Sequence, residues 1–494
     1  MKKIFILFLL SIQISVAQKN EFLDREFWKK NPTIETIDKK INARNNPTEL
    51  NKFGFDAIVY ALLENTNNNT IKHLLSIKGN SVNKLTHDGR TYLFWAVYKN
   101  NIEFVKHLII NGAKMDVIDD KGYSVINFAA ATGQQNKELY TMLLKNGANI
   151  NSLTPKGANA ILLLAPNLNN LDFTKYFTNK GLKLTNTDYN GNGIFNYAAT
   201  KGNKFILNAI IKKGLPYKNL NKNGGNAMLF ATKGNRNGYN SLGFFKYLES
   251  LGINPNITNI NGKTPLHNLA YSSKNIAPYK YFIEKGVDVN QVNKEGDTPL
   301  LQACYRNNIN VISYLLKQTE NINHSNKKGI TALTNAIRAN TPKVIELLLK
   351  NDADISVLDK QGNNLMYYLI QSYSSNNEKD FNQKMEILGS NGLDMSAVQK
   401  NGNTLYHLAI ENQALSLFEI IKIFRQNINA KNNDGYTVLQ KAVMTARNTE
   451  IIKYLIKEGA DINVITDFKE SVLDLAKENE SLKNENLGFL KTSL

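Results

Sequence analysis

The sequence predicts an all-α solenoid of helix-turn-helix units joined by β-hairpin-like loops. Three observations support this prediction. A glycine recurs with a period of about 33 residues, a small residue follows it by seven positions, and apolar residues later in each unit have helical spacing. A period of this length is typical of repeat architectures, in which each unit buries its apolar face only against its neighbours.

Each unit opens with a turn around a glycine, which we call the anchor of that repeat. Glycine permits the positive φ angle that a hairpin tip requires. A further unit keeps the pattern but has Lys469 in place of the glycine, so we expect about twelve to thirteen degenerate repeats. The anchors are Gly54, Gly89, Gly122, Gly157, Gly191, Gly224, Gly262, Gly296, Gly329, Gly362, Gly402 and Gly435.

The first helix of each unit follows its anchor. In the best-preserved unit, Thr264 is placed to cap this helix and Pro265 to occupy its first position, where no amide donor is needed. The residue seven positions after the anchor is alanine in ten units and leucine in three, which predicts close packing against the next repeat. The alanines are Ala61, Ala96, Ala129, Ala198, Ala231, Ala303, Ala336, Ala409, Ala442 and Ala476.

The second helix of each unit carries one apolar stripe. Segments such as Val105 to Ile109 and Val344 to Leu349 have apolar residues three and four apart. A glycine then stands where a helix C-cap belongs, at Gly112, Gly147, Gly214, Gly286 and Gly459. Both halves of the unit are therefore predicted to be helical.

The best-preserved unit reads Gly-Lys-Thr-Pro-Leu-His from Gly262 to His267, and the next reads Gly-Asp-Thr-Pro-Leu from Gly296 to Leu300. This resembles the ankyrin repeat, a 33-residue turn plus two helices with a T-P-L-H-x-A signature. The resemblance implies a non-enzymatic scaffold that binds other proteins. It also implies that His267 forms a hydrogen bond between adjacent units.

The chain ends are expected to differ from the array. Residues 1–17 have a basic start, an apolar core and a small-residue site at Ser15-Val-Ala17, which predicts a cleaved signal peptide. We expect an exported bacterial protein, periplasmic or secreted, with no transmembrane segment in the mature chain. Residues 18–53 are predicted to form an N-terminal capping segment, 54–468 the ankyrin-repeat array, and 469–494 a C-terminal capping half-repeat.

No residue pattern indicates catalysis, so we expect no enzyme activity and no catalytic residue. Cys304 is the only cysteine, and the six histidines lack metal-ligand spacing, so no metal and no cofactor are predicted. No phosphate-binding loop or nucleophile elbow is present.

The net charge of +18, which falls to +16 without Lys2 and Lys3, has two interpretations. It favours a partner that is an anionic polymer, such as a surface glycan or extracellular nucleic acid. The joint richness in asparagine, lysine and isoleucine is equally typical of compositional bias in a genome.

The resemblance to ankyrin repeats implies binding of a protein partner by a monomer through its concave face. The family's contact positions are the residue after the anchor and the pair nine and ten residues beyond it. Tyrosine and arginine at such positions are typical of binding hot spots. Carried onto this chain, these positions give Arg90, Tyr98, Lys99, Tyr123, Lys263, Tyr271, Tyr305, Arg306, Arg338 and Tyr436.

Overall fold

The computed structural model describes residues 20–235 and 238–491. Within those ranges the ordered elements are helices, and extended backbone occurs only as four isolated bridges. The all-α prediction is therefore confirmed. Three of the bridges flank anchors, as the hairpin-like loops require: Thr86 with Arg90, Ile118 with Ser124, and Ile465 with Ser471. The predicted signal peptide lies outside the described residues.

The chain divides into two compact bodies, which meet in sequence between Asn219 and Leu220. The N-terminal body contains α1 (Arg25–Lys29), α2 (Ile34–Asn42), α3 (Ala57–Leu63), α4 (Asn68–Ser76), α5 (Tyr92–Tyr98), α6 (Ile102–Ile110), α7 (Val125–Ala131), α8 (Lys137–Lys145), α9 (Ala160–Leu164), α10 (Thr174–Thr178), α11 (Ile194–Ala198) and α12 (Lys204–Lys212). Its 3-10 turns are η1 (Glu21–Leu23), η2 (His87–Gly89), η3 (Ala165–Asn167) and η4 (Ala199–Lys201).

The C-terminal body contains α13 (Ala227–Ala231), α14 (Leu242–Ser250), α15 (Pro265–Ala270), α16 (Ile276–Glu284), α17 (Pro299–Arg306), α18 (Ile309–Leu316), α19 (Ala332–Ala339), α20 (Pro342–Leu349), α21 (Leu365–Gln371), α22 (Glu378–Ser390), α23 (Leu405–Ala409), α24 (Leu415–Ile421), α25 (Val438–Thr445), α26 (Glu450–Lys457) and α27 (Val472–Glu478). Its 3-10 turns are η5 (Ser375–Asn377), η6 (Ile410–Asn412), η7 (Lys422–Phe424), η8 (Glu480–Leu482) and η9 (Gly488–Leu490).

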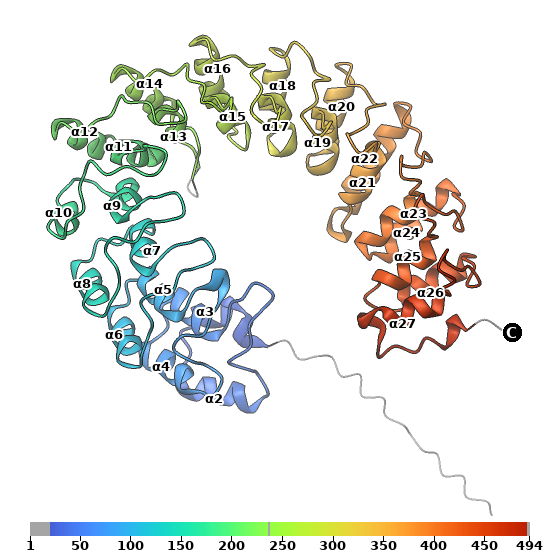
Figure 1. Cartoon of the computed structure of the whole chain (residues 1–494), viewed down its shortest axis with the longest axis horizontal. Helices are drawn as coiled ribbons and strands as arrows, with labels where there is room; N and C mark the ends of the chain where they lie inside the picture. Colours follow the sequence, from blue (N-terminus) through green and yellow to red (C-terminus); the bar gives the residue numbers. More distant parts are fainter. Residues whose placement is uncertain (1–19, 236–237, 492–494) are drawn as a thin grey trace, which may run out of the picture. The chain divides into compact units, whose positions relative to one another are not determined.

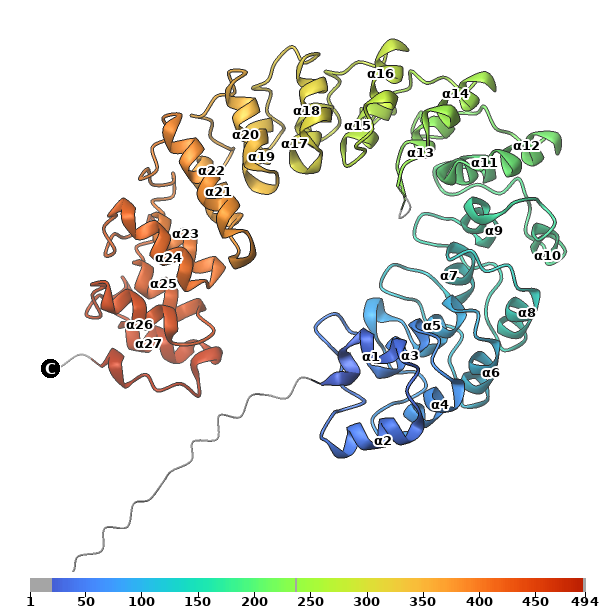
Figure 2. The same ribbon diagram turned by 180° about the vertical axis from the view of Figure 1, so that it is seen from behind.

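Within each body, the two helices of a repeat belong to different layers. Helices α15, α17 and α19 lie side by side in the first-helix layer, and α16, α18 and α20 form the second-helix layer (Figures 1 and 2). The N-terminal body repeats this arrangement, with α5 and α7 in one layer and α6 and α8 in the other (Figure 1). The core lies between and within these layers.

The ten small residues seven positions after the anchors are buried, and so are the leucines that replace them at Leu164, Leu269 and Leu369. Four of the six aromatic side chains one position earlier are buried as well, namely Trp95, Phe128, Phe230 and Tyr368, whereas Tyr60 is half-buried. Tyr197 is only half-buried, because its hydroxyl reaches out to donate to the Asp188 carboxylate at 2.9 Å. The predicted packing of neighbouring first helices is therefore confirmed.

A polar residue three positions before the anchor shapes each hairpin. In the Gly329 repeat, Asn326 Oδ1 accepts from the backbone N–H groups of Lys328 and Ile330. The backbone N–H of Lys327 donates to the Glu295 carbonyl at 3.0 Å, which joins this tip to the preceding one. Nine repeats have this asparagine or aspartate geometry, at Asn51, Asp119, Asp188, Asn221, Asn259, Asn293, Asn326, Asp359 and Asn432.

Glycine is needed at the tip for two reasons. Gly329 has a φ of +80°, and a Cβ atom there would lie 2.8 Å from the backbone of Asp359 and Lys360 in the next hairpin. Lys469 also has a positive φ, +64°. Within the described residues no hairpin follows that of Lys469, so its side chain meets no neighbouring hairpin tip there.

The histidine of the signature joins neighbouring repeats. The backbone N–H of Thr264 donates to His267 Nδ1 at 3.3 Å, so Nε2 carries the proton and donates to the Asp297 carbonyl of the next repeat at 3.0 Å. His407 makes the same pair of contacts with Thr404 and Tyr436. Burial lowers the pKa of both histidines. The predicted role of His267 is confirmed.

Asparagine side-chain amides donate hydrogen bonds to carbonyls at the end of the first helix in the preceding repeat. The Nδ2 of Asn307 donates to the carbonyls of Ala270 and Ser273, and that of Asn340 donates to the carbonyls of Cys304 and Asn307. The Ala270 and Cys304 carbonyls belong to the last turn of a helix, where no intrahelical donor remains, and those of Ser273 and Asn307 lie just after the helix end. Asn412 and Asn479 do the same for Ile370 and Val443. We call these contacts the asparagine clamps.

A lysine replaces the clamp in the Gly362 repeat, whose interhelix loop is longer. The clamp position holds Tyr373, and the buried Lys384 of α22 instead donates Nζ to the Ile337 carbonyl at 2.8 Å. Burial lowers the pKa of Lys384, and Asp380 partly offsets that effect. The carbonyl thus receives a donor even where the local sequence has changed.

Replacement of Asn307 by leucine is expected to destabilise the C-terminal body, because the Ala270 carbonyl loses its side-chain donor, whereas the Ser273 carbonyl keeps the Tyr279 hydroxyl. An unpaired buried carbonyl costs about 1–3 kcal/mol. Urea unfolding followed by hydrogen exchange should show the loss around α15 to α18 first. Asn351→Ala is the control, since its exposed side chain bonds only within its own helix, to Leu347. Equal effects of the two substitutions would contradict the clamp.

Stability is expected to fall between about pH 7 and pH 5, because His267 and His407 have lowered pKa values in the folded chain. As the pH falls, the histidines take up protons in the unfolded state first, near their ordinary pKa of about 6.5. This protonation stabilises the unfolded state relative to the folded one and so lowers the free energy of unfolding. The double variant His267→Gln/His407→Gln should flatten this dependence, since Gln440 fills the same place naturally with Thr437. Urea midpoints at both pH values measure the effect, and an unchanged slope in the variant would contradict it.

Candidate functional site

Arg90 is nine-tenths buried, so it does not present its charge to a partner. Its Nε donates to the Asp119 carboxylate at 2.8 Å, and Nη1 lies 3.1 Å from the Asp88 carboxylate. Its guanidinium carbon is 4.5 Å from the centroid of the Phe128 ring. Burial alone would raise the pKa of Asp88, but Lys121 and Arg90 outweigh it and lower that pKa. We therefore remove Arg90 from the candidate binding residues, since it joins two hairpins internally.

The other predicted residues of the N-terminal body differ in exposure. Tyr98 is exposed at the end of α5, whereas Lys99 is half-buried and donates Nζ to the Leu63 carbonyl at 2.8 Å. Tyr123 is half-buried, and burial together with Asp119 raises its pKa. Of these three side chains, Tyr98 is the best placed to meet another molecule.

In the C-terminal body, three predicted residues come together as what we call the Tyr305 cluster: Tyr305, Arg306 and Arg338. The guanidinium carbons of Arg306 and Arg338 lie 5.2 and 5.6 Å from the centroid of the Tyr305 ring. Tyr305 is half-buried and both arginines are exposed. The cluster spans two consecutive repeats, since Tyr305 and Arg306 end α17 and Arg338 lies near the end of α19.

The remaining predicted residues do not join this cluster through any contact in the described part of the chain. Lys263 and Tyr271 are exposed, and Tyr271 is the C-cap residue of α15. Tyr436 is half-buried, and its carbonyl accepts from His407. Tyr436 therefore contributes to the hairpin as well as to its surface.

Small residues and clamps bring α17 and α19 close enough to form the cluster. Ala303 and Cys304 are buried between helices, and Asn335 of α19 donates Nδ2 to the Leu301 carbonyl at 2.9 Å. Asn340 then ties the end of α19 to the end of α17. The side chains of Tyr305, Arg306 and Arg338 extend from these helix ends. The packing of α17 against α19 therefore fixes where they start.

The chemistry of the cluster suits recognition of an acidic or flat aromatic group. Neither arginine has an acidic partner within 4.0 Å among the residues that the structure describes. A free guanidinium can bind a carboxylate or phosphate with two parallel hydrogen bonds. A contact between arginine and an aromatic ring contributes about 0.5–1 kcal/mol at an exposed site, which orders the side chains before binding.

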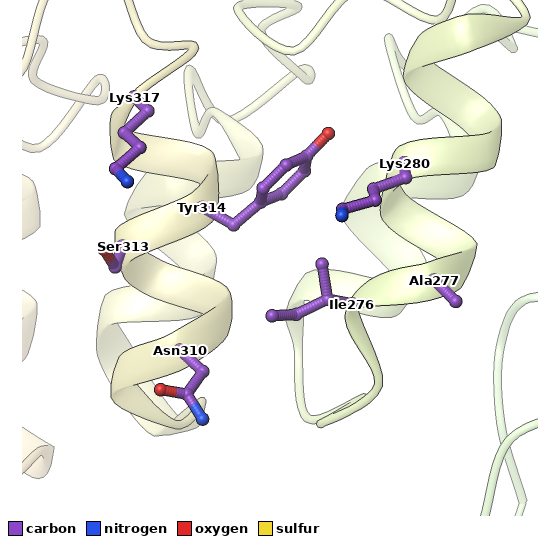
Figure 3. A pocket seen from close by; sticks show the side chains of 7 residues that line it. All are labelled: Ile276, Ala277, Lys280, Asn310, Ser313, Tyr314 and Lys317. Carbon is purple, nitrogen blue, oxygen red and sulfur yellow. The ribbon is translucent and has the colours of Figure 1, made fainter.

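A pocket of about 390 Å³ lies in the second-helix layer, between α16 and α18 (Figure 3). Lys280 and Tyr314 face each other across it, with Nζ 5.9 Å from the ring centroid. Its lining has no acidic residue, histidine or cysteine. The lining residues are Ile276, Ala277, Lys280, Asn310, Ser313, Tyr314 and Lys317.

The described ranges also contain no cluster of metal-binding side chains. No three histidine, cysteine, aspartate or glutamate side chains there are arranged to hold a metal ion. Cys304 is fully buried, and this burial raises the pKa of its thiol. None of the helices in those ranges combines the length and the apolar character that crossing a bilayer requires.

Sequence reasoning missed an exposed aliphatic position, four residues before the anchor. Alignment of the units on their glycines reveals this signal, because the position is apolar although the polar residue next to it points into the hairpin. The exposed aliphatic side chains at this position are Leu50, Leu85, Ile118, Leu153, Leu220, Val292, Leu358, Val398 and Ile465.

Comparison with known proteins agrees with the repeat geometry. A family model described as "Ankyrin repeats (3 copies)" matches residues 31–119, 58–154, 237–326 and 373–466, which together make up more than half of the chain. A protein of fowlpox virus (strain NVSL), "Putative ankyrin repeat protein FPV031", is 36% identical over 73 residues. That match covers 14% of this chain and 21% of the viral protein. With its anchors, buried alanines and signature histidine in place, the chain belongs to the ankyrin repeat family.

Proposed function

We propose that this protein is a non-enzymatic scaffold that binds a protein partner through the first-helix side of its repeats, with the Tyr305 cluster as the main contact. Ankyrin repeats are in general not catalytic and bind other proteins. The observation that carries the proposal is the pair of unpaired arginines around a half-buried tyrosine. Tyrosine and arginine are the side chains most enriched in binding hot spots.

The partner is proposed to lie in the cell envelope or outside the cell, because residues 1–17 have the pattern of a bacterial signal peptide. Export would remove Lys2 and Lys3 and leave the rest of the array unchanged. Mass spectrometry of the protein from its native host tests this point, since cleavage is expected after Ala17. We further propose that the exported chain acts as a monomer.

Binding of an anionic polymer is the alternative, and the net charge of +18 favours it. The two functions differ in salt dependence. For a polymer such as heparin or DNA, the logarithm of the binding constant falls steeply and linearly with the logarithm of the salt concentration. A polymer binder would also tolerate the loss of Tyr305, because a single exposed ring adds little to a distributed electrostatic interaction.

The triple variant Tyr305→Ala/Arg306→Ala/Arg338→Ala is expected to lose its partner, because truncation of hot-spot residues costs about 2 kcal/mol or more each, which is about a thirtyfold loss of affinity. A photo-crosslinker is placed at position 271 of the full chain, in the repeat that precedes the one with Tyr305. It should capture the partner in envelope and culture-medium fractions. Captured proteins are identified by mass spectrometry.

The matched control carries Lys280→Ala, Tyr314→Ala and Lys317→Ala, a similar set of side chains in the second-helix layer. This control should keep the same crosslinks. Unchanged crosslinks in the cluster variant, with the fold intact by circular dichroism, would remove the Tyr305 cluster as the contact surface.

A further inference from the structure

Three of four consecutive hairpins in the C-terminal body expose an aliphatic side chain at a position where folding does not require one. Val292, Leu358 and Val398 are 40%, 58% and 56% exposed, and each stands four residues before its anchor. The next residue along the chain is polar and buried in two of these hairpins, as Asn293 and Gln399. Apolar groups point outward and polar groups inward, which inverts the usual preference.

The inward polar residues form the hydrogen bonds that shape the hairpin, whereas the outward aliphatic side chains take no part in those bonds. Asn293 Oδ1 accepts from the backbone of Glu295 and Asp297, as every hairpin of this type requires. In the Gly329 repeat the outer position is Ser325, and the hairpin forms with the same backbone bonds. An aliphatic side chain is therefore not required for folding at this position. Single exposed apolar residues are common on protein surfaces, whereas groups of them that form a larger patch mark interaction sites. Recurrence at one position of neighbouring hairpins places these side chains in one series.

Lysine recurs two residues before the anchor in the same four hairpins. The N–H groups of Lys327, Lys360 and Lys400 each donate to a carbonyl of the preceding hairpin, at 3.0, 2.9 and 3.4 Å. These bonds hold the tips in one continuous series. We define the hairpin row as the outer aliphatic residues Val292, Leu358 and Val398 together with Lys294, Lys327, Lys360 and Lys400.

The lysines of the hairpin row lack counter-charges within the chain. All four are exposed, and the ion pairs of the described residues do not include any of them. Three acidic residues lie in these hairpins. The carboxylate of Asp359 already accepts from Tyr368 and Asn363, and that of Asp297 accepts from Asn326, which leaves Glu295 as the exposed acid. The row therefore presents a net positive charge beside an apolar strip.

We propose that the hairpin row binds an acidic segment of a partner protein, in which carboxylates pair with the lysines and aliphatic side chains cover Val292, Leu358 and Val398. A nucleic acid or a sulfated glycan matches the charge only, whereas a polypeptide supplies both kinds of group. The proposal goes beyond the Tyr305 cluster, since it uses different residues and stands without them.

Two synthetic 20-residue peptides test the proposal with the full chain. One contains glutamate and leucine spaced by serine, and the other has serine in place of each leucine, so that both carry the same charge. The leucine peptide is expected to bind about tenfold or more tightly, because burial of aliphatic area adds to the electrostatic attraction. Its binding should persist at about 0.5 M salt, where exposed charges are screened. Fluorescence anisotropy of labelled peptides measures both.

Variants then separate the two parts of the row. Val292→Ser/Leu358→Ser/Val398→Ser should reduce the affinity for the leucine peptide to that for the serine peptide, and Ser325 shows that serine is compatible with the hairpin. Replacement of the four lysines by glutamine should abolish binding of both peptides.

The matched control substitutes serine at Leu85, Ile118 and Leu153, the same outer position in three hairpins of the N-terminal body. These three hairpins have His87, Asp120 and Pro155 instead of lysine two residues before the anchor. It should bind both peptides as the unaltered chain does. Equal affinity for the two peptides, or no effect of the serine variant, would overturn the proposal. Heparin that competes better than the leucine peptide and ignores the serine variant would assign the row to an anionic polymer instead. None of these outcomes alters the test of the Tyr305 cluster.

Discussion

Close approach of consecutive repeats is the constraint on which the rest of this structure depends. At the hairpin tips the approach is so close that a Cβ atom on Gly329 would collide with the next backbone. In the first-helix layer it is achieved by alanine at one position per repeat, as at Ala303 and Ala336, both fully buried. Each repeat has little core of its own, so this contact supplies most of its apolar burial.

The same close approach shields polar backbone groups from water, and the asparagine clamps supply them with hydrogen-bond donors. The end of a first helix leaves carbonyls without donors, and the neighbouring repeat shields them from water. An asparagine amide reaches from one repeat to the next and pairs with them, as Asn307 and Asn340 do. The high asparagine content therefore has a structural use, whatever the bias of the genome.

The two bodies treat charge differently. In the N-terminal body, the fully buried carboxylate of Asp56 accepts from Tyr92 at 2.7 Å and from Lys84 at 2.8 Å, and burial raises the pKa of Tyr92. Arg90 is neutralised in the same internal manner. In the C-terminal body, the arginines of the Tyr305 cluster and the lysines of the hairpin row are left without acidic partners. Unpaired, ordered positive charge is available there for another molecule.

The sequence alone determined the elements and their packing, because the positions of glycine, of alanine and of the apolar stripe repeat with one period, and a period can be read without a structure. The inter-repeat hydrogen bond of His267 was implied instead by the resemblance of its unit to the ankyrin signature. The fate of individual side chains was decided only by the tertiary structure. Arg90 occupies a typical contact position, yet it is buried and forms an ion pair with Asp119 of the next repeat. Tyr305, Arg306 and Arg338 each fit the contact pattern singly, but their assembly depends on how closely α17 and α19 approach. Such contacts join residues about one repeat apart, so each depends on the neighbour that a given repeat happens to have, and periodicity alone does not contain that information.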